Sequence, residues 1–276
     1  FGRYWMGVTH LEKNDYGAAI SALEGAAASV AADHQLTPAI RFQLGEAFRR
    51  AKRPEEAAAH FQLVIDESPE SSWTDDASHG LLRLASDTNQ HAAVEKRASD
   101  FLADHPRSPL AFDVRRMLGR SQMKQEKYDE AIQTLSTLVS ELDEMASVSN
   151  PAGSAPLSRR DAQALAASSR FTLGLAHVGA KQFAEADAAI ASLTPNEETE
   201  PELAAGVNAV RAAALMGQQK YTQAIGPLRN YLRLSPDGPD ANQSRAQLAI
   251  ALAHTNQLPQ AQRAYDELAK TFTDQT

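Results

Sequence analysis

Apolar residues recur along this chain at helical spacing, in blocks separated by short turns. The clearest block runs from residue 40 to residue 69, where Leu44 and Phe48 share one helical face. After a break at Pro54, Phe61 and Val64 mark the apolar face of a second helix. A pair of helices that each carry one apolar stripe cannot bury both stripes alone. The pattern therefore predicts a helical hairpin that is stable only when copies of it stack.

The same hairpin pattern recurs at a nearly constant interval. Taking the first residue of each predicted second helix as a marker, five of the six separations are 37 or 38 residues and one is 55. The markers are Tyr16, Pro54, His91, Tyr128, Phe183, Tyr221 and Leu258. A small or short residue follows three positions later and a bulky residue follows seven positions later in most units, and small residues such as Gly45 and Ala57 are expected where two helices touch. The third unit has Ala98 at the bulky position, which predicts looser packing there.

These motifs resemble the tetratricopeptide repeat (TPR) family over about residues 2–142 and 168–274. The resemblance rests on Gly7, Gly45, Gly119 and Gly174 in the first helices, on the Tyr-x-x-Ala openings at Tyr16, Tyr128 and Tyr221, and on the closing Pro69, Pro106 and Pro236. Leu82, Ala212 and Ala249 replace the glycine in the other units, and the tryptophan of the family pattern is missing. The resemblance implies an all-α fold, a right-handed superhelical solenoid of about seven TPR-like helical hairpins.

Arginine stands where the family pattern has tryptophan, four residues before the glycine or its substitute. The five residues are Arg3, Arg41, Arg115, Arg170 and Arg245. One interpretation is structural: the stems pack between hairpins, and each guanidinium pairs with an acidic side chain of the preceding hairpin. The other interpretation is a row of ligand contacts.

The single long separation coincides with a segment rich in Ala, Ser, Pro and Gly, residues 146–158. Ser158 and Asp161 form a capping motif, which predicts an early helix start and a long helix to about Ala180. We expect TPR-like repeats 1–4 in residues 1–147, a flexible insert or hinge in 148–158, and repeats 5–7 in 159–276. A surface loop within a continuous stack is the alternative.

Composition narrows the function classes. The net charge of −8 argues against nucleic-acid binding, no run is apolar enough to insert directly into a membrane, and the chain has no cysteine.

The hairpin spacing and the Ser-Pro and His-Pro endings are similar to those of bacterial envelope TPR proteins of the outer-membrane assembly and Tol-Pal coordinator type. This resemblance implies a periplasmic or cell-envelope location, with the cytoplasm as the alternative. Because the chain opens on Phe1 within a helix pattern, we expect the native protein to extend further at one or both ends.

No catalytic, cofactor or metal pattern emerges from the residues. The histidines show no ligand spacing on one helix face, and Gly174 to Gly179 lies within a helix pattern rather than after a strand. We therefore expect no enzyme activity, no cofactor and no metal site. TPR segments also accompany catalytic domains, so an interaction segment of a longer enzyme or envelope-assembly protein stays the alternative function.

The first helices of a stacked array line a concave wall, which in this family takes an extended peptide or a helix of a partner. Positive and aromatic residues are expected on the first half of that wall, and apolar residues on the second half. The candidate groove residues are Tyr4, Phe42, Arg49, Arg50, Arg83, Arg116, Arg120, Lys124, Phe171, Leu175, Met216 and Ile250. This wall predicts a protein or peptide partner with acidic and apolar residues. Pairing of the arginines with Glu46, Asp87 and Asp113 is the competing interpretation, and the pattern does not set the oligomeric state.

Overall fold

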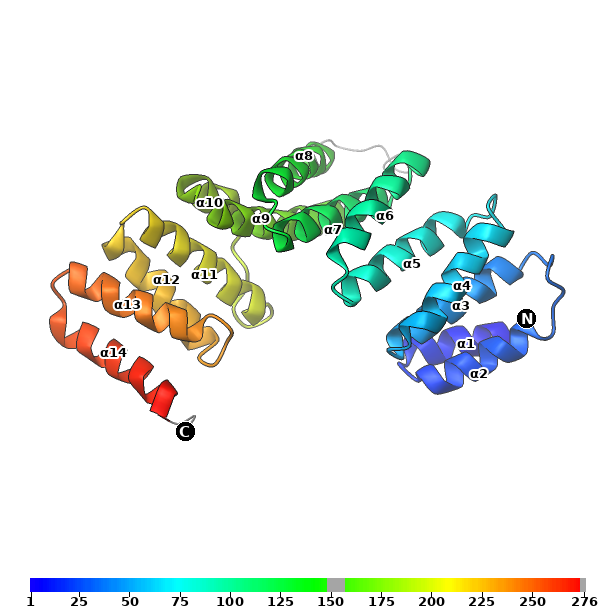
Figure 1. The fold of residues 1–276 in the computed structure, drawn as a ribbon, viewed down its shortest axis with the longest axis horizontal. Coiled ribbons are helices and arrows are strands. Elements are labelled where there is room, and N and C mark those ends of the chain that lie inside the picture. Colours follow the sequence, from blue (N-terminus) through cyan, green and yellow to red (C-terminus); the bar gives the residue numbers. More distant parts are fainter. Residues whose placement is uncertain (148–156, 274–276) are drawn as a thin grey trace. The chain divides into compact units, whose positions relative to one another are not determined.

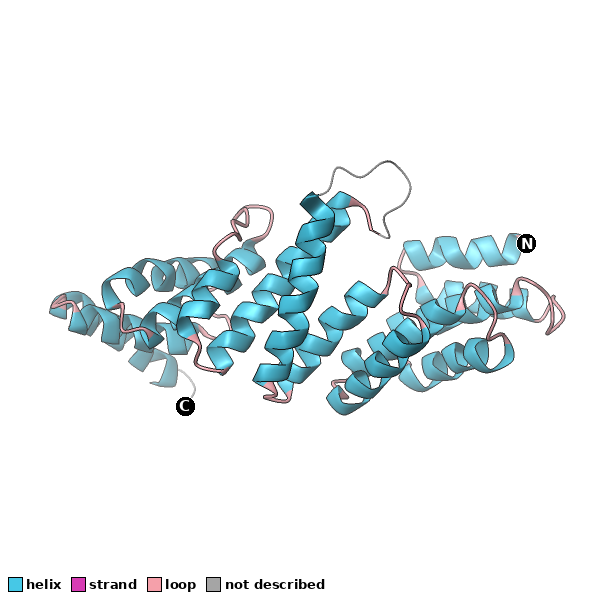
Figure 2. Ribbon diagram, turned by 90° about the horizontal axis from the view of Figure 1, so that it is seen from above, coloured by secondary structure: helices cyan, strands magenta, loops and turns pink. Residues whose placement is uncertain are grey.

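The computed structural model describes residues 1–147 and 157–273, and these residues form helices joined by loops, without a strand among them (Figures 1 and 2). The helices are α1 Gly2–Glu12, α2 Tyr16–Ala27, α3 Thr37–Arg50, α4 Pro54–Glu67, α5 Thr74–Asp87, α6 His91–Asp104, α7 Ala111–Lys124, α8 Tyr128–Ser147, α9 Arg159–Gly179, α10 Phe183–Ile190, α11 Pro201–Gly217, α12 Tyr221–Leu234, α13 Ala241–His254 and α14 Leu258–Thr273. Each of the seven markers opens a second helix, which confirms the predicted hairpin repeat. The all-helical repeat fold is therefore as the sequence predicts.

The same turn precedes all seven second helices, and its central residue lies two positions before the helix start. The turn residue is never glycine, yet its φ lies between 56° and 61°: Asn14, Lys52, Asn89, Glu126, Lys181, Gln219 and Asn256. This backbone conformation costs a non-glycine residue about 1–2 kcal/mol. A hydrogen bond across the turn offsets the cost, as where Arg53 N donates to the carbonyl of Phe48 at 2.9 Å. The turn geometry thus fixes where each second helix begins.

The glycine of the first helix makes room for the bulky residue of the second. A Cβ atom on Gly45 would lie 2.6 Å from the ring of Phe61, and a Cβ atom on Gly7 would lie 2.5 Å from Leu23. Phe61 is fully buried. The sequence predicted Ala57 as the close neighbour of Gly45, but the nearest atoms belong to the Phe61 ring. The tight contact is therefore glycine against a large side chain, because the ring needs the space that a Cβ would fill.

The row of arginines has structural partners. Arg3 donates to the carbonyl of Gly25 at 3.1 Å, Arg41 pairs with Glu67 at 2.6 Å, Arg170 pairs with Asp143, and Arg245 donates to the carbonyl of Pro236 at 2.7 Å. Arg170 has an acidic partner on the preceding hairpin, as predicted. That prediction is wrong for Arg3 and Arg41, whose partners lie on the second helix of the same hairpin. These four contacts favour the structural interpretation of the row.

The chain divides into two compact units, Phe1–Gln125 and Glu126–Thr276. The sequence placed a boundary at residues 148–158, whereas the division falls at the turn between α7 and α8, and α8 and α9 pack against each other within the second unit. Residues 148–156 of the predicted hinge lie outside the described residues. The long helix after it is confirmed: α9 begins at Arg159, and the Ser158 hydroxyl accepts a hydrogen bond from Asp161 N at 3.1 Å.

Candidate partner-binding surfaces

The first helices of each unit contact one another in succession. In the first unit α1 contacts α3, α3 contacts α5 and α5 contacts α7, and in the second unit α9 contacts α11 and α11 contacts α13. The predicted positive residues lie on α3, α5 and α7 within the first unit. We call this set the charged wall: Glu46, Arg49, Arg50, Arg83, Asp87, Asp113, Arg116, Arg120 and Lys124.

A buried carboxylate organises the charged wall between α3 and α5. The side chain of Glu46 is only 7 % exposed, and both its oxygens accept hydrogen bonds from Arg49 at 3.1 Å. Arg49 reaches across to Asp87 on α5 at 2.6 Å. Arg50 and Arg83 approach Glu46 at 3.7 Å and 3.6 Å. Three guanidinium groups thus share one buried carboxylate.

Charge, not burial, decides the ionisation of Glu46. Burial favours its protonated form, but the hydrogen bond from Arg49 and the charges of Arg49, Arg83 and Arg50 outweigh burial, so the pKa of Glu46 lies below its ordinary value. Glu46 therefore stays negative at neutral pH and holds Arg49 inside the wall. The side chain of Arg49 is only 11 % exposed, and its guanidinium is bonded to both Glu46 and Asp87. Arg49 therefore packs within the wall and is not available to contact a partner.

A second polar cluster links α5 to α7. Asp113 accepts from Arg116 at 2.6 Å and lies 2.9 Å from Nε2 of His79. Burial opposes the ionisation of Asp113, but the hydrogen bonds and charges of His79 and Arg116 outweigh it and lower its pKa from 3.8 to about 2. Arg116 is thus paired internally, as the competing interpretation of the sequence predicted. The positive charge of Arg116 is therefore largely neutralised by Asp113 within the wall.

The lowered pKa of Asp113 makes stability depend on pH. Because the folded pKa lies below the unfolded pKa, ionised Asp113 stabilises the fold by about 2 kcal/mol above pH 4, and this contribution is lost as the pH falls towards 2. We expect Asp113→Asn to flatten the dependence of the free energy of unfolding on pH in that window. Urea unfolding at a series of pH values measures it. Asp100→Asn, at an exposed position of α6, should keep the wild-type slope.

Four positive residues of the charged wall stay open to solvent. The side chains of Arg50 and Arg83 are 41 % and 38 % exposed, and Arg120 and Lys124 are exposed on α7.

The two aromatic candidates, Tyr4 and Phe42, are packed against other side chains. Tyr4 is 8 % exposed, and the ring of Phe42 packs against the rings of Phe61 and Trp73 at centroid distances of 5.8 and 5.2 Å.

The aromatic candidates are therefore packing residues, which corrects the prediction that they face a partner. Tyr4 belongs to the core cluster of the first hairpins and Phe42 is partly buried against it, where a large ring fills space between stacked helices. Burial also raises the pKa of Tyr4 above its ordinary value. The sequence register placed them on the correct helices but could not show how far each ring turns towards the next hairpin.

The predicted apolar half of the wall is found in the second unit. A cavity of about 150 Å³ opens between α9, α11 and α13 and is lined by Leu175, Val178, Ala209, Val210, Ala213, Asp240, Gln243, Ser244 and Gln247. Leu175 is the predicted groove residue that lines this cavity. Phe171 is half-buried and its ring covers Gly206, while Met216 is half-buried and Ile250 is 48 % exposed. The open part of this wall is a small cavity with an apolar floor.

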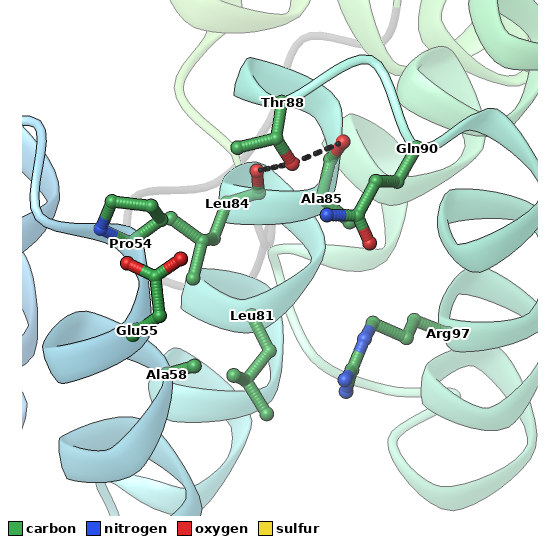
Figure 3. Close-up of a pocket in the computed structure, with 9 residues that line it drawn as sticks. All are labelled: Pro54, Glu55, Ala58, Leu81, Leu84, Ala85, Thr88, Gln90 and Arg97. Atoms are coloured by element: carbon green, nitrogen blue, oxygen red, sulfur yellow. Dashed lines mark hydrogen bonds between the residues drawn. The ribbon is translucent and has the colours of Figure 1, made fainter.

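The structure also shows a pocket that the sequence did not predict, on the second-helix side of the first unit. It has a volume of about 210 Å³ and lies between α4, α5 and α6, with Leu81 and Leu84 between Glu55 on one side and Arg97 on the other (Figure 3). A neighbouring pocket of about 200 Å³ shares Leu81 and Arg97. One residue in the sequence could have indicated this pocket. It is Ala98, the small residue at the bulky position of the third hairpin, which is fully buried next to the pocket residue Arg97.

Two kinds of site find no support in the described residues. No three His, Cys, Asp or Glu side chains among them gather closely enough to hold a metal ion. Likewise, no helix in residues 1–147 or 157–273 combines the length and apolarity that crossing a membrane requires. What these residues do offer is exposed helix faces and shallow cavities, which are features of interaction surfaces.

The geometry thus defines a class, a helical-hairpin repeat protein with exposed first-helix faces. Comparisons with known proteins then indicate the family to which the repeats are similar. Residues 5–72 and residues 113–141 each match a model of the tetratricopeptide repeat. These matches support the tetratricopeptide-repeat family, as the motifs indicated. No curated protein matches the sequence.

Solved structures show the same fold at low sequence identity. A tetratricopeptide repeat protein from Parabacteroides merdae is 12 % identical with a TM-score of 0.61, and the match covers 98 % of this chain and 91 % of that one. The apo form of RapI is 14 % identical with a TM-score of 0.59, covering 99 % and 98 %. A Rap protein complexed with competence and sporulation factor is 13 % identical with a TM-score of 0.52, covering 99 % and 75 %. None of these three names refers to envelope assembly, so that finer resemblance stays a prediction.

Proposed function

We propose that this chain is a non-catalytic scaffold that binds an extended segment or a helix of a partner protein along its first helices. The fold supports a protein-binding role in general, because tetratricopeptide repeats commonly act in protein–protein interaction and one structural neighbour is a Rap protein in complex with a factor. The partner's acidic residues would contact the charged wall. In the second unit, the cavity between α9, α11 and α13 would take apolar side chains of a partner.

The observation that carries this proposal is the positive charge left over on the charged wall. After Arg49 and Arg116 have paired internally, Arg50 and Arg83 share the already occupied Glu46, and Arg120 and Lys124 remain exposed. Because the chain as a whole carries a net charge of −8, this concentration of positive charge is local. Arginine binds carboxylates with two parallel hydrogen bonds, so an acidic segment is the chemistry that fits.

Reversing two exposed charges tests the proposal without disturbing the internal pairs. We expect Arg120→Glu with Lys124→Glu to reduce partner affinity at least tenfold, because two attractive contacts become repulsive. The matched control is Lys96→Glu with Arg107→Glu, the same change of charge at exposed positions of α6 and the following loop. Binding is measured with segments selected by the wild-type chain from a random peptide display library.

The design of this variant depends on the structure. Arg116 would be an unsuitable target, because its removal takes away one of the two partners of Asp113, Arg116 and His79, and would lower stability. If the α7 variant and the α6 control bind selected peptides equally well, or if selection enriches no acidic residues, the charged wall is not the binding surface. Circular dichroism and the melting temperature should stay unchanged in both variants.

The alternative function is an interaction segment of a longer enzyme or envelope-assembly protein. It uses the same surface, so the charge-reversal test does not separate the two. Isolation of the intact protein from its source and fractionation of the cell would do so. We propose a periplasmic or cell-envelope location on the basis of the hairpin endings, and recovery in the cytoplasmic fraction would contradict it.

A further inference from the structure

A groove runs between the second helices α4 and α6, which the structure describes in full and which do not contact each other. Its floor is α5, and its two pockets follow one another along α4 and share Leu81 and Arg97. On α5, Leu81 and Leu84 line the groove, whereas Arg83 and Asp87 belong to the charged wall. The groove is therefore a separate surface, between hairpins that are both present in the chain.

An alanine on α4 leaves part of the space that forms the first pocket. Ala58 lies four residues after the marker Pro54, and three other hairpins have isoleucine at that position, as Ile20, Ile132 and Ile225. Ile20 and Ile225 are each 8 % exposed and belong to core clusters that include the following first helix. Because alanine is too short for this contact, it leaves the following first helix, α5, partly uncovered.

A second alanine removes bulk on the α5 side. Ala85 comes three residues after Leu82, which replaces the repeat glycine, and the other six hairpins have a larger side chain at this position. Those side chains are His10, Phe48, Gln122, His177, Leu215 and Leu252. Both Ala58 and Ala85 line the pocket, next to Leu81 and Leu84. The pocket thus occupies space that side chains fill in other hairpins, and a large aliphatic side chain fits it.

Charged side chains without partners surround this apolar floor. Glu55 lies on the α4 side and Arg97 on the α6 side (Figure 3), and Asp100 and Asp104 continue the α6 side along the second pocket. All four are exposed, and none of these side chains makes an ion pair or a hydrogen bond within the part of the chain that the structure describes. Three carboxylates against one guanidinium give the groove a negative balance, which attracts a basic segment.

We propose that this groove binds a short extended segment of a partner protein in which one large aliphatic residue is flanked by two basic residues. The aliphatic side chain fills the pocket beside Ala58 and Ala85. One basic residue contacts Glu55, and the other contacts Asp100 or Asp104. This chemistry is opposite to that of the acidic segment proposed for the charged wall, so neither proposal depends on the other.

The length of the groove sets the spacing of the two basic residues. From Glu55 to Ile65 the α4 side spans about 15 Å at the rise of an α-helix, which an extended segment of about five residues covers. Arg97 and Gln90 extend into the pocket from the α6 side (Figure 3), where they donate to main-chain carbonyl groups of the segment. Residues 148–156 and 274–276 of this chain contain no lysine or arginine and so lack the required charges.

A fluorescently labelled peptide, Gly-Ser-Lys-Ser-Leu-Ser-Lys-Ser-Gly, tests the groove on the full chain by fluorescence anisotropy. The wild-type chain should bind it in a saturable way. Ala58→Ile restores the isoleucine of other hairpins and fills the pocket, so it should weaken binding about tenfold or more. Its melting temperature should stay the same or rise, because the added side chain follows the chain's own repeat pattern. Serine in place of the peptide's leucine should weaken binding to the wild-type chain by a similar factor.

Charge reversal tests the basic residues of the segment. Glu55→Lys with Asp104→Lys should weaken binding of the lysine peptide about tenfold and strengthen binding of the same peptide with glutamate in place of both lysines. Ala58→Ile added to this variant should remove the gain, which separates the groove from the charged wall. The matched control is Glu12→Lys with Asp33→Lys, the same change of charge at exposed positions of the first hairpin and the loop after it. The control should keep the wild-type preference for the lysine peptide.

Four results would overturn the proposal. The first is no saturable binding of the lysine peptide, and the second is equal affinity of the wild-type and Ala58→Ile chains. The third is an equal loss of affinity in the groove variant and in its control, because binding would then follow net charge alone. The fourth is peptide binding that appears only when a dimer of the chain dissociates on dilution, because a second copy would then be the occupant.

Discussion

Replacing Phe61 with alanine is expected to lower the free energy of unfolding of residues 1–125 by about 3–5 kcal/mol. Phe61 is fully buried, and its ring fills the space above both Gly45 and Gly80, so its loss leaves a cavity at a junction of two hairpins. Urea unfolding followed by tryptophan fluorescence measures the change. Both tryptophans, Trp5 and Trp73, lie within the first unit and report on it directly.

A second substitution separates this account from a general sensitivity of the core. Gly80→Met alone should cost about 1–3 kcal/mol, because its side chain would collide with the Phe61 ring. In combination with Phe61→Ala, the methionine fills the vacated space, copying the arrangement of Ala98 and Met117. The double variant should therefore be less destabilised than the sum of the two single variants by about 0.5–3 kcal/mol. Strict additivity would contradict the size complementarity of Phe61 and Gly80.

Removal of the Glu46 carboxylate is the second large effect. We expect Glu46→Ala to destabilise the first unit by about 3–5 kcal/mol, because it leaves the 11 % exposed guanidinium of Arg49 without its two bonds to Glu46. The same urea experiment measures it. The side chains of Arg50 and Arg83 would also lose the anion that they approach at 3.7 and 3.6 Å.

Asp87 provides the control for this prediction. It also bonds Arg49, at 2.6 Å, but its side chain is 44 % exposed and water can take its place. Asp87→Ala should therefore cost about 1 kcal/mol or less. Equal losses for Glu46→Ala and Asp87→Ala would show that burial of the carboxylate does not matter, and the description of Glu46 as the organising residue would be wrong.

The repeat register explains why the fold could be predicted from the sequence. The start of every second helix follows from the interval of 37 or 38 residues, and the structure places all seven where they were expected. The turn that produces these starts was harder to foresee. Its left-handed residue is Lys52, Glu126 or Gln219 as readily as Asn14, because one strained residue is tolerated when the hydrogen bonds across the turn are made.

The candidate site was predicted less completely, since it depends on contacts between helices. The sequence placed Arg49 and Arg116 on the correct wall, but only the structure shows that Arg49 reaches Asp87, thirty-eight residues away, and is used internally. The pocket next to Leu81 lies between side chains of three helices, close to the small residue Ala98. Such features require packing, which a repeat pattern does not specify.

The measurement that tests the central claim most directly is hydrogen–deuterium exchange of the chain with and without a selected acidic peptide. Binding along the first helices predicts slower exchange of amides in α3, α5 and α7, where the charged wall lies. The helices α4 and α6 should change less. Protection confined to α4 and α6, with no change in α3, α5 and α7, would contradict the proposal that the charged wall binds the partner.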